Sequence, residues 1–351
     1  MRGLVPLLAL LVAPHPLRSE EPARGSALLP GKPPRLATWG RGVQIREPYT
    51  GRVEASAGAS REFAAAGCVA ALEPGASPGL VVQEGLGAGD LVWWPGPGRN
   101  FERLDTGAAM ASCAGARLFG RDGVLVIHRH GQVRFYERGR SRYREIYSFY
   151  TPSRQSGLLT ADVNGDGRPD IVAGNYRIRS PEAFPLPWRL FAIHAWSELE
   201  ESAMLCLARL GRGVAAAQTA LSPARISVFT PRENPELLWS ETPLVVEPPP
   251  SRISCLAVGD FDADGRPDIA AGEDRGPASR LLAFFDCGAG YSAAVVDVGE
   301  PAAGCHALER RAGGGMGLLS VSARSIRWHD PNQSRKSRAS PSSPSRRSRA
   351  P

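Results

Sequence analysis

The sequence predicts an all-β fold, a β-propeller with four-stranded blades, and three observations support it. A short apolar run recurs six times in steps of 45 to 50 residues, and each copy is followed by a second run ending in bulky residues. The 39 glycines and 31 prolines among 351 residues favour turns over long helices. A period of roughly 40 to 50 residues with several short strands per unit is typical of propellers.

One position defines the six copies of the first run: Cys68, Cys113, Leu158, Cys206, Cys255 and Cys305. The second runs lie at 91–94, 133–136, 190–193, 226–229, 281–285 and 326–328. We expect six blades, with seven as the alternative. The last repeat reaches the end of the patterned region before its outer strands are complete. The segment 36–62 is therefore expected to close the ring by supplying N-terminal strands, which would also cover the open edge.

The chain divides into four predicted regions: a signal peptide at 1–19, a linker at 20–35, the propeller at 36–331 and a basic tail at 332–351. Arg2 precedes ten mostly apolar residues at 4–13, the length of the apolar core of a secretory signal. No segment approaches the roughly 18 apolar residues of a transmembrane helix. We therefore expect a secreted, periplasmic or cell-surface protein without a transmembrane segment.

The net charge of +7 is concentrated at the two ends of the chain. The tail holds six cations and no acid, namely Arg335, Lys336, Arg338, Arg346, Arg347 and Arg349. Arg2 and Arg18 add two more, which leaves the body near 7 − 6 − 2 = −1. A body with this balance has no basic face for nucleic acid. The Ser/Arg/Pro-rich tail has nothing apolar to bury and is predicted to be disordered.

Five of the six cysteines occupy the repeat position, where the third copy has leucine. This pattern indicates small apolar side chains on inner strands, so free buried thiols are the expected state. Disulfides between neighbouring blades are the alternative, since six cysteines in an exported chain can form three. A count of reactive thiols in the unfolded, unreduced protein distinguishes the two.

Two acidic loops, 98 residues apart, are the candidate metal-binding sites of the sequence. Each places oxygen-bearing side chains at positions 1, 3, 5 and 9 and arginine at position 7. The first loop has Asp162, Asn164, Asp166, Arg168 and Asp170, and the second has Asp260, Asp262, Asp264, Arg266 and Asp268. Alternate residues converge when such a loop curls, and Gly167 or Gly265 permits the positive φ that curling requires.

Carboxylates this close repel one another unless a cation neutralises them. Calcium accepts roughly 6 to 8 oxygens in flexible geometry, so the side chains, the Arg168 or Arg266 carbonyl and water can fill its shell. Magnesium prefers a smaller octahedral site. We expect two structural Ca²⁺ sites. An EF-hand is disfavoured because position 12 is Ala173 or Ala271 instead of glutamate; a metal-free hairpin held by Asx-turns is the alternative.

The two loops, with their Ile-Val-Ala-Gly and Ile-Ala-Ala-Gly continuations, resemble FG-GAP/VCBS repeats, the calcium-binding repeats of integrin-α-like propellers. The resemblance implies an Asp-rich calcium loop between the first two strands of a blade. It also implies a role in adhesion, ligand binding or scaffolding, although some relatives carry enzymatic activity. It therefore bears on fold and metal more than on function.

Catalytic patterns are weak in this sequence. Gly75–Gly79 matches G-x-S-x-G but lacks a following helix, and the pair His128 and His130 lacks a third metal ligand. The predicted function is therefore a non-catalytic binding or interaction module, a monomer that recognises a protein or glycan. The alternative is a carbohydrate-active enzyme resembling a polysaccharide lyase, or a lectin, on the same scaffold.

Overall fold

The computed structural model describes residues 17–18, 22–129, 131–140, 142–149, 156–195, 204–218, 223–311 and 315–333. Apart from a helical turn at 331–333, its regular secondary structure is antiparallel β-sheet. Among the described residues, no helix is long and apolar enough to cross a membrane. Most of the predicted signal peptide, and the predicted tail from residue 334 onward, lie outside these residues.

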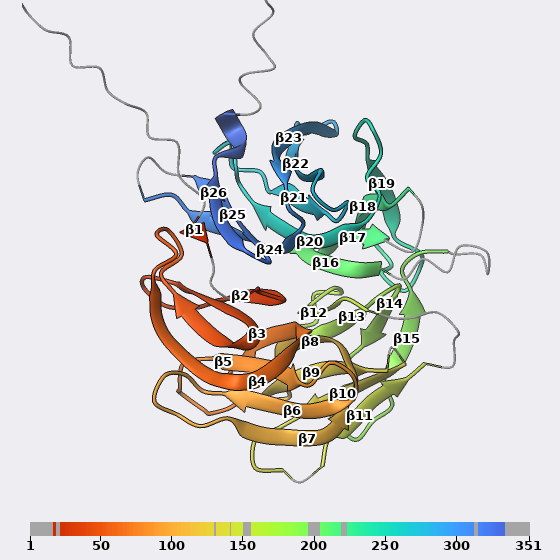
Figure 1. The fold of residues 1–351 in the computed structure, drawn as a ribbon. Coiled ribbons are helices and arrows are strands. Elements are labelled where there is room, and N and C mark those ends of the chain that lie inside the picture. Colours follow the sequence, from red (N-terminus) through yellow and green to blue (C-terminus); the bar gives the residue numbers. More distant parts are fainter. Residues whose placement is uncertain are drawn as a thin grey trace, which may run out of the picture.

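Five sheets have four strands each (Figure 1). Four of them are built from consecutive strands. One contains β8 (Met110–Leu118), β9 (Arg121–His128), β10 (Gln132–Tyr136) and β11 (Arg144–Ser148), and the next contains β12 (Leu158–Ala161), β13 (Asp170–Ala173), β14 (Tyr176–Arg179) and β15 (Arg189–Ala192). The third contains β16 (Met204–Leu210), β17 (Gly213–Gln218), β18 (Arg225–Thr230) and β19 (Ser240–Leu244), and the fourth contains β20 (Ile253–Gly259), β21 (Asp268–Glu273), β22 (Ser279–Asp286) and β23 (Tyr291–Gly299). The fifth joins β24 (Ala302–Glu309), β25 (Met316–Ser322) and β26 (Ser325–His329) to β1 (Leu17–Arg18).

The sixth sheet has six strands: β2 (Gly25–Leu29), β3 (Arg35–Arg46), β4 (Val53–Ala70), β5 (Gly79–Glu84), β6 (Gly89–Trp94) and β7 (Glu102–Ala108). Its long strand β4 pairs with two different strands along its length. Residues 53–62 of β4 pair with β3, and residues 63–70 pair with β5. The strand therefore passes from one group of strands to the next without a turn.

The sheets are arranged around a centre (Figure 1). A cavity of about 390 Å³ is lined there mainly by the first strand of each group, together with Trp39 of β3. These lining strands are β2, β4, β8, β12, β16, β20 and β24, and each contacts the next, including β24 with β2. The repeat position lies on them, and small residues dominate the lining because inner strands converge. The arrangement is that of a β-propeller, as the sequence predicts.

The ring is closed by N-terminal strands, but not by the segment that the sequence predicts. Residues 36–62 supply β3 and the first part of β4, which join β2 instead of the last repeat. The strand β2 comes from the predicted linker, and its Ser26 Oγ lies 2.8 Å from His306 Nε2 on β24. The two residues of β1, from the predicted signal peptide, pair with β26 at the outer edge of the last sheet.

The second apolar run of the third repeat does not correspond to those of the other repeats. The other runs lie on the third strands of their repeats, whereas residues 190–193 fall mainly in the fourth strand, β15. The third strand is β14, whose sequence Tyr-Arg-Ile-Arg alternates polar and apolar residues. A search for apolar runs does not detect β14, because the strand contains the charged residue Arg177.

The cysteine prediction is wrong for four of the six residues. Cys68 is joined to Cys113, and Cys255 to Cys305, each bridge connecting neighbouring inner strands. The paired Cα atoms are 5.7 and 5.6 Å apart, within the usual range for disulfides. Repeat positions on adjacent inner strands are thus close enough to bridge. Cys206 and Cys287 take part in neither disulfide.

Candidate functional site

Both acidic loops connect the first and second strands of their sheets. The first follows β12 and precedes β13; the second follows β20 and precedes β21. Position 2 of each loop is a fully buried apolar residue, Val163 or Phe261, which anchors the loop to the core. The strand pattern therefore holds both loops at the same place in their respective sheets.

The aspartate at position 1 organises each turn. Asp162 accepts hydrogen bonds from the backbone N–H groups of Gly165, Asp166 and Gly167 at 2.8, 3.1 and 2.9 Å. In the second loop, Asp260 accepts them from Asp264 and Gly265 at 3.1 and 3.0 Å. These bonds explain why the loops curl, since a short acidic side chain readily bonds the backbone that follows it.

The backbone angles confirm the predicted role of the position 6 glycines. Gly167 and Gly265 have φ values of 80° and 87°, in the left-handed region that favours glycine. Position 4 is also left-handed in both loops, with Gly165 at 75° and Ala263 at 63°. The second loop thus tolerates a non-glycine residue there, which indicates that its conformation is strongly held.

Three carboxylates of the second loop converge. Ligand oxygens of Asp260, Asp262 and Asp268 all lie within 4.8 Å of one another. Asp268 is fully buried and accepts backbone hydrogen bonds from Phe261 and Asp286, both at 2.9 Å. Burial raises the pKa of Asp268 to about 6, and these backbone bonds oppose the shift. A hard cation with oxygen ligands fits this group of atoms.

The equivalent aspartate of the first loop has a different partner. Asp170 is fully buried, and its Oδ2 lies 2.8 Å from Nε and 2.6 Å from Nη2 of Arg177, which is also fully buried. The N–H of Ser180 donates to Asp170 Oδ1 at 2.9 Å. Burial raises the pKa of Asp170, whereas Ser180 and Arg177 lower it. The structure therefore directs this carboxylate toward a guanidinium group.

Positions 5 and 7 of the two loops are alike, whereas position 3 is Asn164 in the first loop and Asp262 in the second. Arg168 Nη2 lies 2.6 Å from Asp166 Oδ2, and Arg266 makes the same ion pair with Asp264. Asn164 Nδ2 donates to Asp166 at 2.8 Å, and Asn164 Oδ1 is buried without a hydrogen-bond donor among the described residues. The side chains at positions 5 and 7 thus neutralise each other within each loop.

Each acidic loop is joined to the following sheet by one arginine, and neither arginine was predicted from the sequence. Arg212 Nη2 donates to the carbonyl of Val163 at 2.7 Å, and Arg310 Nη2 donates to that of Phe261 at 2.7 Å. Each arginine follows position 1 of its loop by 50 residues (212 − 162 and 310 − 260). That equal spacing was the available signal. The arginines couple the loop conformation to the packing between neighbouring sheets.

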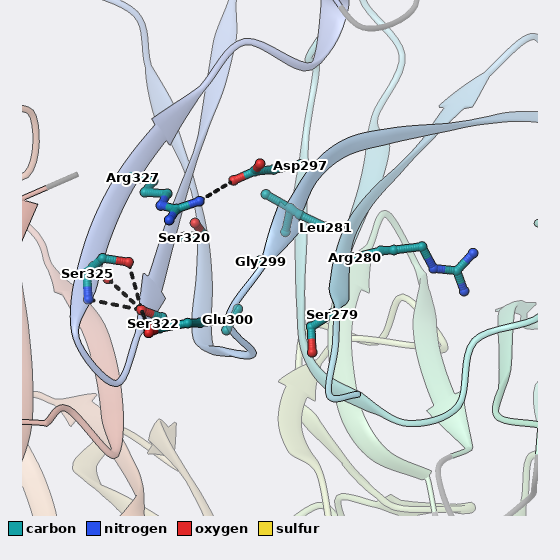
Figure 2. Close-up of a pocket in the computed structure, with 11 residues that line it drawn as sticks. Ser279, Arg280, Leu281, Asp297, Gly299, Glu300, Ser320, Ser322, Ser325 and Arg327 are labelled. Carbon is teal, nitrogen blue, oxygen red and sulfur yellow. Dashed lines mark hydrogen bonds and ion pairs between the residues drawn. The ribbon is translucent and has the colours of Figure 1, made fainter. Parts of the chain in front are cut away.

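A crevice between β22–β23 and β25–β26 holds a second polar cluster (Figure 2). Two of its lining residues, Ser320 and Asp297, also lie near His329, which is not part of the lining: Ser320 Oγ is 2.8 Å from His329 Nε2, and His329 Nδ1 is 3.9 Å from Asp297. Arg327 forms an ion pair with the same carboxylate, with its Nη1 3.0 Å from Asp297 Oδ2. The crevice encloses only about 20 Å³, close to the space needed by one water molecule. It is too small to admit a sugar ring.

Comparison with known families agrees with the loop geometry. The FG-GAP repeat family matches residues 155–177, which contain the whole first loop and Arg177. The chain therefore carries an FG-GAP repeat, and the resemblance inferred from the sequence is confirmed at this position. None of the curated proteins matches the chain.

Solved structures share the fold at low sequence identity. The crystal structure of BBS1N in complex with ARL6DN, soaked with mercury, is 12% identical with a TM-score of 0.56, over 89% of this chain and 93% of that chain. YCF48 from Cyanidioschyzon merolae is 11% identical with a TM-score of 0.56, over 90% and 98%. At these identities the similarity concerns the fold alone.

Proposed function

We propose that this protein is an exported β-propeller that acts as a non-catalytic interaction module and is stabilised by calcium. The observation that carries the calcium role is the convergence of Asp260, Asp262 and Asp268. The FG-GAP match and the propeller-like neighbours support an interaction module, and one of those neighbours was crystallised with a partner, ARL6DN. The partner of this chain would be a protein or a glycan.

We also infer seven blades, the count that the sequence analysis held as its alternative. The six-stranded sheet divides within β4, so that β2, β3 and residues 53–62 form one blade. Residues 63–70 then begin the next blade with β5, β6 and β7. This division is supported by the seven inner strands β2, β4, β8, β12, β16, β20 and β24, each of which contacts the next around the cavity.

Export is supported by the disulfides as well as by the apolar N-terminal segment. Bridges such as Cys68–Cys113 and Cys255–Cys305 form and persist mainly in oxidising compartments. The proposed location is the extracellular space, the periplasm or the cell surface. A monomer remains our expectation for the oligomeric state.

Calcium would be held in the second loop by the carboxylates of Asp260, Asp262 and Asp268, with Asp264 and the Arg266 carbonyl as further oxygen ligands. The ion would supply two positive charges to a short turn that holds four acidic side chains, one of which, Asp264, is already paired with Arg266. The first loop offers the same positions, but its Asp170 lies against Arg177. The ion has a structural role in this proposal, because it would hold together the turn that connects β20 to β21.

Chelation is expected to lower the melting temperature of the wild-type protein. Calcium at tenfold excess over its dissociation constant contributes about 1.4 kcal/mol to the folded state, and EGTA removes this term. Differential scanning calorimetry with calcium or with EGTA measures the change. Asp262→Asn should abolish the response, whereas Asp274→Asn, on an exposed acid outside the loop, should retain it. A wild-type protein whose melting temperature ignores EGTA would contradict the calcium role.

Binding without turnover is the expected behaviour toward carbohydrates. A glycan array tests whether the protein recognises a sugar, and a reducing-end assay on the bound polysaccharides tests for cleavage. We expect no product at any calcium concentration, because the acidic residues that cluster lie in the second loop and the crevice lined by Ser320 and Asp297 encloses only about 20 Å³. Calcium-dependent release of oligosaccharides would favour the alternative, a polysaccharide lyase on this scaffold.

A further inference from the structure

The two acidic loops differ in their balance of charge, although their sequences match closely. In the first, the guanidinium groups of Arg168 and Arg177 contact Asp166 and Asp170. In the second, Arg266 contacts Asp264, and the carboxylates of Asp260, Asp262 and Asp268 converge. The first loop thus has one more fixed positive charge, from Arg177, and one carboxylate fewer, because Asn164 stands at the position of Asp262.

Arg177 is fixed beside Asp170 by three elements. It lies on β14, paired in register with Val172 of β13, so its side chain emerges next to the start of that strand. Its Nη1 donates to the carbonyl of Pro235 at 3.3 Å, in the connection between β18 and β19. Its guanidinium carbon also lies 5.9 Å from the ring centre of Phe191. A buried, multiply held guanidinium is a permanent counter-charge.

The corresponding register position in the second blade holds no cation. Val172 pairs with Arg177 in the first blade, and Ala270, 98 residues later, pairs with Ala283. Asp268 consequently has no arginine beside it among the described ion pairs, and its carboxylate is held by the backbone N–H groups of Phe261 and Asp286. In this position it lies with Asp260 and Asp262.

We propose that Arg177 takes the place of the divalent cation in the first loop, so that the protein binds one calcium ion, in the second loop, and not two. This inference rests on the proposed calcium role of the second loop. One buried side-chain acceptor of the first loop, Asn164 Oδ1, has no hydrogen-bond donor among the described residues, and it is a neutral amide oxygen. A water molecule satisfies such an atom, so it creates no demand for a cation.

Equilibrium dialysis with calcium alone counts the ions. The wild-type protein is expected to bind one, Asp262→Asn none, and Asp166→Asn, the matched loss of an acid from the first loop, still one. Two ions on the wild type, or the loss of an ion in Asp166→Asn, would overturn the proposal. A wild type that binds no calcium would overturn the proposed function itself, and the inference with it.

Substitution of Arg177 provides the complementary test. Arg177→Met removes the internal cation and is expected to raise the count from one ion to two, whereas Arg177→Lys keeps a positive charge and should leave it at one. Circular dichroism and gel filtration establish whether each variant is folded. If Arg177→Met does not fold, the counts for the wild type and Asp166→Asn decide the question. A folded Arg177→Met that still binds one ion would show that Arg177 does not exclude calcium.

Discussion

Replacing Arg177 with alanine is expected to lower the free energy of unfolding by about 3 to 5 kcal/mol when calcium is removed with EGTA. The substitution leaves Asp170 fully buried without the guanidinium that contacts its Oδ2 at 2.6 and 2.8 Å. An uncompensated buried charge costs much more than the net value of the pair, because the carboxylate has lost its solvation by water as well as its partner. Urea unfolding, followed by tryptophan fluorescence, measures the loss.

Two further variants separate the buried charge from the loss of packing. Arg177→Met combined with Asp170→Asn removes both charges and should recover most of the stability, because the coupling between the two sites is then absent. Arg189→Ala, on an exposed arginine at the start of β15, should change the free energy by less than about 0.5 kcal/mol. If Arg177→Ala behaves like Arg189→Ala, the buried pair has no structural importance.

Removing the Cys255–Cys305 bridge is expected to cost about 4 kcal/mol. The two residues are 50 positions apart, and in the chain-entropy model a crosslink across a loop of that length restricts the unfolded chain by about this amount. The double variant Cys255→Ala/Cys305→Ala tests this by urea unfolding. Cys206→Ala is the matched control, since Cys206 lies on a neighbouring inner strand and is free.

Reduction provides an independent check on the disulfides. A reducing agent should destabilise the wild type more than the double variant, which retains only the Cys68–Cys113 bridge. Titration of the unfolded, unreduced wild type should find two reactive thiols, from Cys206 and Cys287. Six thiols would restore the interpretation that the sequence favoured and would remove the stability argument made for both bridges.

The repeat architecture could be predicted because the equivalent position of each copy has the same surroundings and therefore requires the same kind of side chain. The shared position at Cys113, Leu158 and Cys206 lies on an inner strand, where little space is available, so the same kind of side chain recurs. The turns of the acidic loops are equally local. An aspartate at position 1 and a glycine at position 6 specify them within six residues.

Features that depend on the closed ring could not be predicted. The strand β2 lies in a polar, proline-rich segment and becomes a strand only because β3 pairs with it and β24 packs beside it. The cysteine pairs depend on the distance between neighbouring inner strands, which a repeat period does not reveal. The strands β2 and β3 carry no acidic loop or repeat cysteine, so the six-fold pattern did not include them.

Arg177 was missed for a different reason. An arginine between tyrosine and isoleucine on a short strand has the pattern of a solvent-facing residue, because polar residues alternate with apolar ones on half-exposed strands. Only the pairing of β13 with β14 places it next to Asp170. A buried ion pair between adjacent strands therefore leaves no periodic signal, even when its two members are seven residues apart.

Arg310 connects parts of the molecule that would otherwise be treated separately. Its guanidinium group donates to the carbonyls of Phe261 and Met316 and forms an ion pair with Asp330 at 2.8 Å. The second acidic loop, the start of β25 and the segment after β26 thus share one side chain. Energies measured for substitutions at these places will not add, since each changes the surroundings of the same group. Their effects describe one network and cannot be divided among metal binding, loop order and ring closure.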